Sequence, residues 1–375
     1  MIILAVVILA LYSILILAFI IGFNRVENLN TVSSPPTTSF SIVIPFRDED
    51  RNLMYLLDSL SILNYPKELF EIILIDDVST DNSVDIIDDF KHKNSKLNIE
   101  VFTNNRTSGS PKKDAIETAI NYANFDWIVS TDADCKVPQN WLLIFNEHIQ
   151  NHQPKLIAAP VTYCTTNSLL DQFQLLDLMS LQGATIGGFG IGTPFLCNGA
   201  NLCYEKQAFL DINGFKGNKH IASGDDIFLL EKMKNMYPDS THFLKSDKAI
   251  IMTKPEAAVT KLLSQRIRWA AKATSYTNNF SKLVSMAVFS MNILLIILFF
   301  GCLLSYYSWL LFVIAFIIKV CLDFILLLKT ATFFNQHTTL KHYFWSSIIY
   351  PFFTIFIALS SFTSGYSWKG RTYKK

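Results

Sequence analysis

The sequence predicts an α/β domain with a mostly parallel sheet, placed between membrane-spanning helices. One observation is that short apolar, β-branched runs alternate with stretches of helical periodicity between residues 41 and 130. Alternation of this kind is typical of a parallel sheet with helices on both faces. The second observation is that both ends of the chain contain uncharged apolar runs of the length that a membrane helix needs.

Composition and charge narrow the class of protein. The 375 residues include 32 basic and 31 acidic ones, and this net charge of +1 argues against nucleic acid as a partner. Charged residues make up 17% of the chain and hydrophobic residues 50%, which excludes extensive disorder and disfavours a purely soluble protein. The six cysteines form no CxxC pair, so neither a zinc site nor a disulfide framework is indicated.

The first membrane segment is expected over residues 1–23, which contain no charged side chain. As a helix it would be roughly 34 Å long, enough to cross a hydrocarbon core of about 30 Å. A cleaved signal peptide is the alternative, but such peptides begin with basic residues and none precedes this run. We therefore expect an N-terminal transmembrane anchor, followed by a linker over residues 24–40 that contains Pro35 and Pro36.

The central domain, residues 41–280, opens with four expected strands. These strands are short and apolar and cover residues 41–45, 70–75, 98–102 and 126–130. Helices are expected between them, from leucines at helical spacing after residue 53 and from the patterns at 83–93 and 112–123. Ligands bind at the carboxyl ends of the strands in such sheets, so the residues that follow each strand are the functional candidates.

About three further membrane segments are expected within residues 281–365, ahead of a basic tail at 366–375. Helices near 283–304 and 308–329 divide an uncharged run that is too long for one crossing, and another lies at 344–363.

The orientation of these segments is less settled. Arg25 and Lys282 favour a cytoplasmic central domain, but three full crossings would then leave the basic tail outside. Either the 344–363 segment, which contains Pro351, is re-entrant or interfacial, or the number of crossings differs from three.

Acidic residues follow two of the expected strands. Asp76 and Asp77 follow the second strand, and Asp132-Ala133-Asp134 follows the fourth. Carboxylates two residues apart can face the same side of an extended or tightly turned backbone. Such hard oxygen ligands suit Mg²⁺ or Mn²⁺ and leave other positions of the ion for substrate phosphates.

Six short motifs resemble those of the inverting family 2 glycosyltransferases, which have the GT-A nucleotide-sugar fold, over roughly residues 41–275. The motifs are Pro45-Phe46-Arg47-Asp48-Glu49, Asp76-Asp77-Val78-Ser79-Thr80-Asp81, Pro111-Lys112-Lys113-Asp114-Ala115, Asp132-Ala133-Asp134, Gly224-Asp225-Asp226 and Gln265-Arg266-Ile267-Arg268-Trp269. The last motif fits the family's Q-x-x-R-W pattern without departure and is the most specific of the six. Val78 replaces a glycine, and because valine tolerates positive φ poorly, we expect that turn to differ slightly.

The resemblance implies a donor site for a nucleotide diphosphate sugar, with Mg²⁺ or Mn²⁺ as cofactor. Pro45, Glu49 and Asp77 would lie at the base, Asp132 at the ribose, and Asp134 at the cation on the diphosphate.

The resemblance also implies the groups that act in the transfer. Lys112 and Arg268 would stabilise the leaving diphosphate, and Asp226 would take the proton of the acceptor hydroxyl. Gln265 and Trp269 would lie with Arg268 near the acceptor and the diphosphate, although Trp269 also suits a membrane–water boundary.

Two versions of a membrane glycosyltransferase remain open. One moves a sugar, as a UDP-sugar, to a lipid or lipid-linked acceptor, as do the ceramide and carotenoid enzymes whose tails resemble Trp368-Lys369-Gly370-Arg371. The other is a processive synthase like those of poly-N-acetylglucosamine, hyaluronan and cellulose, which would need a homodimer or an export partner because the chain has few membrane segments. The expected location is a bacterial inner membrane with the catalytic domain in the cytoplasm. A catalytically silent scaffold or transporter is disfavoured by the acidic motifs.

Several other features have plainer interpretations. Lys319 and Asp323 are interpreted as a self-neutralising pair that faces other protein, rather than a transport path. Lys113 is interpreted as a solvated surface charge, and residues 183–192, which are rich in glycine, as a mobile loop near the acceptor. His220 is interpreted as a loop residue. The remaining acidic residues of the motifs, interpreted as turn and cap residues, are Asp76, Asp81 and Asp225.

Overall fold

A computed structural model describes residues 2–275, 277–363, 366–368 and 371–373. The chain divides into two compact units, which we describe separately. The sheet unit comprises residues 27–164 and 197–254, and the membrane unit comprises residues 1–26, 165–196 and 255–375.

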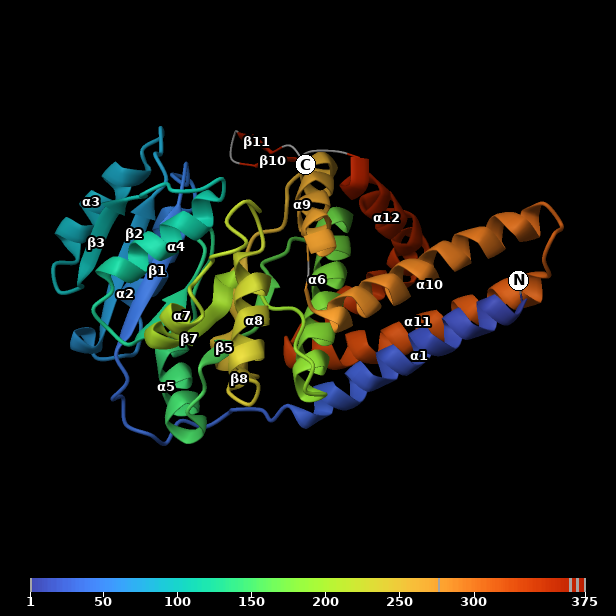
Figure 1. The fold of residues 1–375 in the computed structure, drawn as a ribbon, viewed down its shortest axis with the longest axis horizontal. Coiled ribbons are helices and arrows are strands. Elements are labelled where there is room, and N and C mark those ends of the chain that lie inside the picture. Colours follow the sequence, from blue (N-terminus) through green and yellow to red (C-terminus); the bar gives the residue numbers. More distant parts are fainter. Residues whose placement is uncertain (1, 276, 364–365, 369–370, 374–375) are drawn as a thin grey trace. The chain divides into compact units, whose positions relative to one another are not determined.

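The sheet unit is built on a seven-stranded sheet with the order β3-β2-β1-β4-β7-β5-β8 (Figure 1). The strands are β1 (Phe40–Phe46), β2 (Phe70–Asp76), β3 (Ile99–Thr103), β4 (Trp127–Ser130), β5 (Leu156–Ala158), β7 (Leu202–Glu205) and β8 (Thr241–Phe243). The first four pair in parallel, β7 is antiparallel to both neighbours, and β5 and β8 are parallel. The mostly parallel sheet is therefore confirmed, and each expected strand agrees within one residue at either end.

Helices connect these strands. They are α2 (Leu53–Ser61), α3 (Ser83–Lys93), α4 (Pro111–Tyr122), α5 (Trp141–His152), α7 (Lys206–Asp211) and α8 (Asp225–Met236). A separate two-stranded parallel sheet pairs β6 (Val161–Tyr163) with β9 (Ile251–Thr253). The sequence pattern indicated α2, α3 and α4 but not the later elements, whose strands are only three or four residues long.

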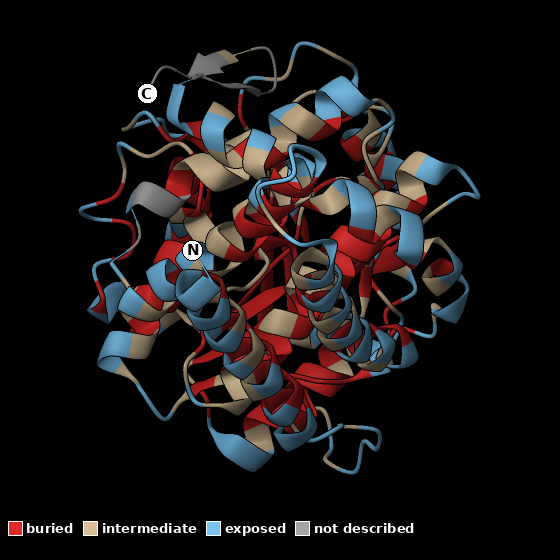
Figure 2. Ribbon diagram, turned by 90° about the vertical axis from the view of Figure 1, so that its right-hand side faces the viewer, coloured by how far each residue is buried: buried red, intermediate tan, exposed pale blue. Residues whose placement is uncertain are grey.

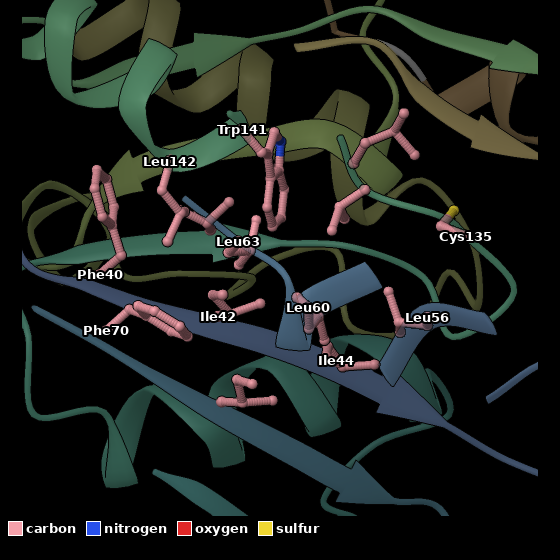
Figure 3. Close-up of a cluster of buried hydrophobic side chains, with 14 of the residues drawn as sticks. Phe40, Ile42, Ile44, Leu56, Leu60, Leu63, Phe70, Cys135, Trp141 and Leu142 are labelled. Carbon is pink, nitrogen blue, oxygen red and sulfur yellow. The ribbon is translucent and has the colours of Figure 1, made fainter. Parts of the chain in front are cut away.

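The main core of this unit lies between β1, α2 and α5. Ile42 and Ile44 of β1, Leu56 of α2 and Trp141 of α5 are each 0% exposed, and Figure 3 shows these side chains in one cluster. Strands buried on both faces require continuous apolar runs, which is why β1 and β2 were the clearest strands in the sequence. Truncation of a buried leucine such as Leu56 to alanine would cost about 2–5 kcal/mol.

The segment expected as a linker is held against the sheet unit. The backbone N–H of Leu29 donates to the Lys245 carbonyl at 2.9 Å. The N–H groups of Ser33 and Ser34 donate to the Glu147 carboxylate of α5 at 3.0 and 2.7 Å. Residues 29–34 of this segment are therefore ordered by hydrogen bonds to the Lys245 backbone and to the Glu147 side chain of α5.

The membrane unit contains four helices that are long and apolar enough to cross a membrane. The candidate spans are Ile2–Arg25, Asn279–Leu303, Trp309–Phe333 and His337–Thr363, and they correspond to α1, α10, α11 and a 3₁₀ turn with α12 (Tyr343–Thr363). One N-terminal and three C-terminal membrane helices are thus confirmed within the described residues. Pro351 lies inside α12, and the orientation of the helices stays a prediction.

The expectation of a mobile glycine loop at 183–192 was wrong. Residues up to Gly190 belong to α6 (Leu169–Gly190), a helix of the membrane unit. A Cβ on Gly187 would lie 2.6 Å from the Phe19 carbonyl oxygen, and one on Gly190 would lie 1.9 Å from that of Gly22. These glycines let α6 and α1 approach closely, which is the use of small residues at membrane helix contacts.

Three polar side chains of the membrane helices α1 and α11 bind one another. Lys319 Nζ lies 2.6 Å from Asp323 Oδ2, and the Tyr12 hydroxyl donates to Asp323 Oδ1 at 2.7 Å. Lys319 is only 3% exposed, so the pair faces other protein, as interpreted from the sequence. The outer faces of the long helices carry exposed residues instead (Figure 2).

In the tail, β10 (Tyr366–Trp368) pairs antiparallel with β11 (Arg371–Tyr373). Lys369 and Gly370 of the tail motif lie outside the described residues.

Candidate active site

The register of the sheet brings the polar strand ends to one edge. Phe46 pairs with Asp76, and Asp76 pairs with Thr103, so the residues after β1, β2 and β3 begin at the same level. Pro45 is a residue of β1 itself and pairs with Ile75. This edge is where an open parallel sheet binds ligands.

The loops after β1 and β2 are locked together. The N–H of Thr80 donates to Asp48 Oδ1 at 2.8 Å, and the N–H of Glu49 donates to the Ser83 hydroxyl at 2.9 Å. Asp81 accepts from the N–H groups of Asp50 and Ser83, which supports its interpretation as a turn and cap residue. Burial alone would raise the pKa of Asp81, but these hydrogen bonds outweigh it and hold the pKa below its usual value.

Val78 adopts a positive φ, the backbone conformation that valine was expected to tolerate poorly. Its φ is 61°, in the left-handed region that favours glycine, and the side chain is 54% exposed. The side chain of Asp76 accepts from the Ser79 N–H at 2.9 Å, so Asp76 closes this turn. The valine therefore adopts a backbone conformation typical of glycine, at the cost of backbone strain.

Asp77 is buried and bound by a bidentate arginine. Arg106 places Nε 2.6 Å from Asp77 Oδ1 and Nη2 2.7 Å from Oδ2. Asn104 donates to Oδ1 at 2.8 Å and also to the Pro111 carbonyl at 3.0 Å. Asn104 therefore links Asp77 to the first turn of α4, where Lys112 follows Pro111.

Lys112 forms ion pairs with two carboxylates, one from the turn after β4 and one from α8. Its Nζ lies 2.6 Å from Asp132 Oδ1, after β4, and 3.3 Å from Asp225 Oδ2, at the start of α8. Burial alone would lower the pKa of Lys112, but Asp132, Asp225 and Asp226 outweigh it and raise the pKa well above its usual range. Asp225 therefore does more than cap a helix.

Gly199 makes the close approach of these groups possible. A Cβ at this position would lie 3.0 Å from Asp225 Oδ2 and 3.4 Å from Lys112 Nζ. Its carbonyl accepts from the Ser130 hydroxyl at 3.0 Å, which fixes Gly199 against the end of β4.

The interpretation of Lys113 as a solvated charge was wrong. Lys113 is 0% exposed, and its Nζ donates to the carbonyls of Asn218 and Ile221 at 2.8 and 2.9 Å. The Nζ also lies 4.7 Å from the centre of the Phe228 ring. Its stem crosses an apolar interior and its ammonium group anchors the loop that leads to Asp225 and Asp226, a placement that helix periodicity alone does not reveal.

A second lysine holds the same loop. Lys232 of α8 donates to the carbonyls of Ile212, Gly214 and Lys216 at 3.2, 2.6 and 2.8 Å. Burial lowers the pKa of Lys232 below its usual value. His220 lies exposed in this loop, in agreement with its interpretation.

Asp134 and Asp132 are the two carboxylates of the turn after β4, and a divalent cation held there together with a substrate diphosphate is a proposal. Asp134 lies in the turn after β4 with Asp132, and burial, Asp134 and Asp132 together raise the pKa of the Cys135 thiol well above its usual value. Among the described residues no group of three His, Cys, Asp or Glu side chains is arranged to hold a metal alone. Mg²⁺ and Mn²⁺ sites of this type use one or two carboxylates and complete the coordination with phosphates and water.

The Q-x-x-R-W residues belong to the membrane unit, on α9 (Val259–Ala271). Gln265 Nε2 donates to Glu256 Oε1 at 3.1 Å, and the guanidinium carbon of Arg266 lies 4.2 Å from the centre of the Trp269 ring. Arg268 is on the same helix. That these residues take part in the same reaction as those of the sheet unit is a proposal.

Sequence reasoning missed Asn104, Arg106 and Gly199. Asn104 and Arg106 follow β3, so the rule that ligands bind at strand ends would have selected them had it been applied to the third strand. Gly199 carried no local signal, because its role depends on side chains that are distant in the sequence.

The chain is similar to known glycosyltransferases. Residues 127–368 match the profile of "Glycosyl transferase family group 2", and residues 41–204 match "Glycosyl transferase family 2". The chain is 26% identical over 194 residues to a dolichyl N-acetyl-α-D-glucosaminyl phosphate 3-β-D-2,3-diacetamido-2,3-dideoxy-β-D-glucuronosyltransferase of Methanococcus voltae, covering 50% of this chain and 56% of the relative.

Other relatives match shorter segments. A poly-β-1,6-N-acetyl-D-glucosamine synthase of Staphylococcus aureus is 27% identical over 44% of this chain and 39% of its own length. A poly(ribitol-phosphate) β-glucosyltransferase of Bacillus spizizenii is 38% identical over 28% of this chain and 16% of its own length. The chain thus spans less than two thirds of the length of each of these curated relatives.

A solved structure shares the fold. The mannosyltransferase PcManGT from Pyrobaculum calidifontis, solved in complex with GDP-Man and Mn²⁺, superposes with a TM-score of 0.57 at 15% identity, covering 96% of this chain and 99% of that one. The family group match covers more than half of the chain, and four helices can span a membrane. The chain therefore belongs to the family 2 glycosyltransferases, with the GT-A fold and four helices that can span a membrane.

Proposed function

We propose that the protein moves a sugar from a nucleotide diphosphate sugar, UDP-linked, to a hydroxyl of a lipid or lipid-linked acceptor at the cytoplasmic face of a bacterial inner membrane. The observation that carries this proposal is the cluster of Lys112, Asp132, Asp225 and Asp226 at the carboxyl edge of the sheet. The M. voltae relative, whose name specifies dolichyl N-acetyl-α-D-glucosaminyl phosphate, supports a lipid-linked acceptor.

The donor would lie along this edge. The base would meet Pro45, Glu49 and the Asp77–Arg106 pair, the ribose would lie near Asp132, and the diphosphate near Lys112. A divalent cation at Asp134 would neutralise negative charge on the leaving diphosphate. The GDP-Man and Mn²⁺ in the PcManGT complex support a nucleotide diphosphate sugar and a divalent ion as the ligand classes.

The transfer is a single displacement with inversion. The acceptor oxygen attacks the anomeric carbon as the bond to the diphosphate oxygen breaks, and Asp226 takes the hydroxyl proton. Lys112 stabilises the charge that develops on the leaving diphosphate, and so does Arg268, whose role rests on the sequence motif. Gln265 and Trp269 would contact the acceptor or the diphosphate.

The processive synthase is the second candidate, and the poly-β-1,6-N-acetyl-D-glucosamine synthase relative favours it. The two functions differ in product size, since a lipid glycosylation ends after one sugar whereas a synthase yields a ladder of lengths.

The test supplies a panel of nucleotide sugars to membranes that contain the full chain. We expect release of a nucleoside diphosphate only with Mg²⁺ or Mn²⁺, and a lipid product one sugar heavier by mass spectrometry. Asp226→Asn and Asp134→Ala should each abolish transfer, whereas Asp88→Asn, at an exposed position on α3, should not. Normal transfer by Asp226→Asn would exclude its role as base, and a polymer would favour the synthase.

A further inference from the structure

One residue of the Q-x-x-R-W motif forms a buried ion pair within the membrane unit. Arg266 Nε, on α9, is 2.6 Å from Asp177 Oδ2, on α6. The two side chains are 5% and 6% exposed. Arg266 occupies one of the variable positions of the motif, so the motif itself assigns it no role.

Arg266 contacts two of the fixed residues of the motif, Gln265 and Trp269. Its Nη1 donates to the Gln265 Oε1, and its guanidinium carbon lies 4.2 Å from the centre of the Trp269 ring. One planar guanidinium thus bonds a carboxylate, bonds an amide and stacks on an indole. A lysine could keep the charge but not all three contacts, because an ammonium group is not planar.

Gln265 is also connected to α6, through Glu256. Gln265 Nε2 donates to Glu256 Oε1 at 3.1 Å. The Gln174 amide of α6 forms two hydrogen bonds with the backbone of Glu256. It donates to the Glu256 carbonyl at 3.0 Å and accepts from the Glu256 N–H at 2.9 Å. Helix α6 therefore fixes Gln265 through two routes, one from Asp177 and one from Gln174.

We propose that Asp177 and Arg266 are positioning residues, which hold the Gln265 and Trp269 side chains in the geometry that the transfer requires. This inference rests on the proposed role of Gln265 and Trp269 at the acceptor or diphosphate. Breaking a buried pair destabilises a protein in any case, so the test must separate position from stability.

Two variants make that separation. Arg266→Lys keeps a cation beside Asp177 but loses the stacking on the Trp269 ring and the guanidinium hydrogen bond to Gln265. The reversed pair, Asp177→Arg with Arg266→Asp, restores an ion pair between α6 and α9 but moves the guanidinium away from α9. The matched control is Lys319→Met, which breaks a second ion pair of this unit, Lys319–Asp323 on α11.

We expect Arg266→Lys and the reversed pair to lower kcat at least about tenfold, with the donor KM within about twofold of wild type. The reversed pair should restore the thermal midpoint relative to Asp177→Arg alone. Lys319→Met should lower the thermal midpoint without a comparable fall in kcat measured below that midpoint.

Wild-type kcat in Arg266→Lys, or recovery of kcat along with stability in the reversed pair, overturns the inference. Asp134→Ala in the same assay separates this failure from failure of the proposed function. If Asp134→Ala is inactive while Arg266→Lys is fully active, the inference alone fails. If Asp134→Ala is fully active, the proposed function fails and the inference fails with it.

Discussion

The ammonium nitrogen of Lys112 lies 2.6 Å from Oδ1 of Asp132, and this contact joins the first turn of α4 to the turn that follows β4. Asp225 approaches the same nitrogen to 3.3 Å from the start of α8. One cation thus lies among several carboxylates, and the excess negative charge suits the arrival of a divalent ion with the donor diphosphate.

Replacing Lys112 by methionine should lower kcat by about 100-fold, because a charge that stabilises the leaving diphosphate is lost. Lys96→Met, at an exposed position, is the control and should leave kcat unchanged. A fall in donor affinity alone, with kcat intact, would assign Lys112 to binding rather than to the transition state.

The raised pKa of Lys112 has a consequence for pH dependence. A group whose folded pKa lies above its unfolded value of about 10.4 adds stability that is fully present below pH 10 and is lost only as pH rises through the folded pKa. We therefore expect no loss of activity from Lys112 between pH 6 and about pH 10. Lys112→Arg should give the same alkaline limb of the pH–rate profile as the wild type. A different limb would show that Lys112 loses its proton in this pH range.

Arg106→Ala should weaken donor binding, because it removes the two arginine hydrogen bonds to the Asp77 carboxylate and leaves only weaker partners such as Asn104. We expect the donor KM to rise about tenfold and the unfolding free energy to fall by about 1–3 kcal/mol, since Asp77 is 6% exposed. Steady-state kinetics and thermal unfolding in detergent measure the two effects. An unchanged donor KM would place the nucleotide base elsewhere.

Lys113→Met should loosen the loop at residues 212–224, since two backbone carbonyls of this loop lose their donor. We expect a loss of about 1–3 kcal/mol in stability and faster hydrogen exchange in this loop. Lys112→Met, one residue earlier, should leave exchange in the loop near wild type. Equal exchange in the two variants would show that Lys113 does not anchor the loop.

Val78→Gly should stabilise the protein by about 0.5–1 kcal/mol. Relief of the strained φ of 61° exceeds the extra chain entropy that glycine loses on folding. Val78→Ala keeps a Cβ in the same backbone region and serves as the control, with a smaller gain. Thermal unfolding measures both, and a lower midpoint for the glycine variant would mean that the valine side chain contributes packing that outweighs the strain.

Glu147 should make the sheet unit sensitive to acid. Burial alone would raise its pKa, but hydrogen bonds from Ser34 and Ser33 outweigh it and lower the pKa to about 2. Because the folded pKa is depressed, the contribution is present above the unfolded pKa of about 4.3 and is lost as pH falls through 2. Glu147→Gln should flatten the loss of stability between pH 5 and pH 2, which urea unfolding at several pH values measures.

The sequence predicts strands β1 to β4 of the sheet but not the later strands. Strands β1 to β4 were predicted within one residue. Strands β1, β2 and β4 are largely buried and need a continuous apolar run, whereas β3 is a partly exposed edge strand. Strands β5 and β8 have three residues each and no periodic signal, so only their pairing in the sheet defines them. Asp77, Asp132 and Asp134 could be selected because they follow predicted strands, whereas Gly199 could not.

Two wrong interpretations have the same physical origin. Glycines 187 and 190 indicated a loop, and Lys113 indicated a solvated charge, because each residue type is usually found there. In the tertiary structure the glycines admit the backbone of α1, and the lysine finds two carbonyl acceptors in a buried loop. Both outcomes depend on partners more than 100 residues away in the sequence.

By itself, the sequence determined the alternation of strands and helices, the membrane helices and the acidic strand ends, because these follow from local periodicity and from residue type. Only the tertiary structure decided that Arg106 binds Asp77, that Lys112 joins Asp132 to Asp225, and that Asp177 supports Arg266. Such contacts arise when packing brings distant side chains within hydrogen-bonding distance, and no local pattern in a single chain records that distance.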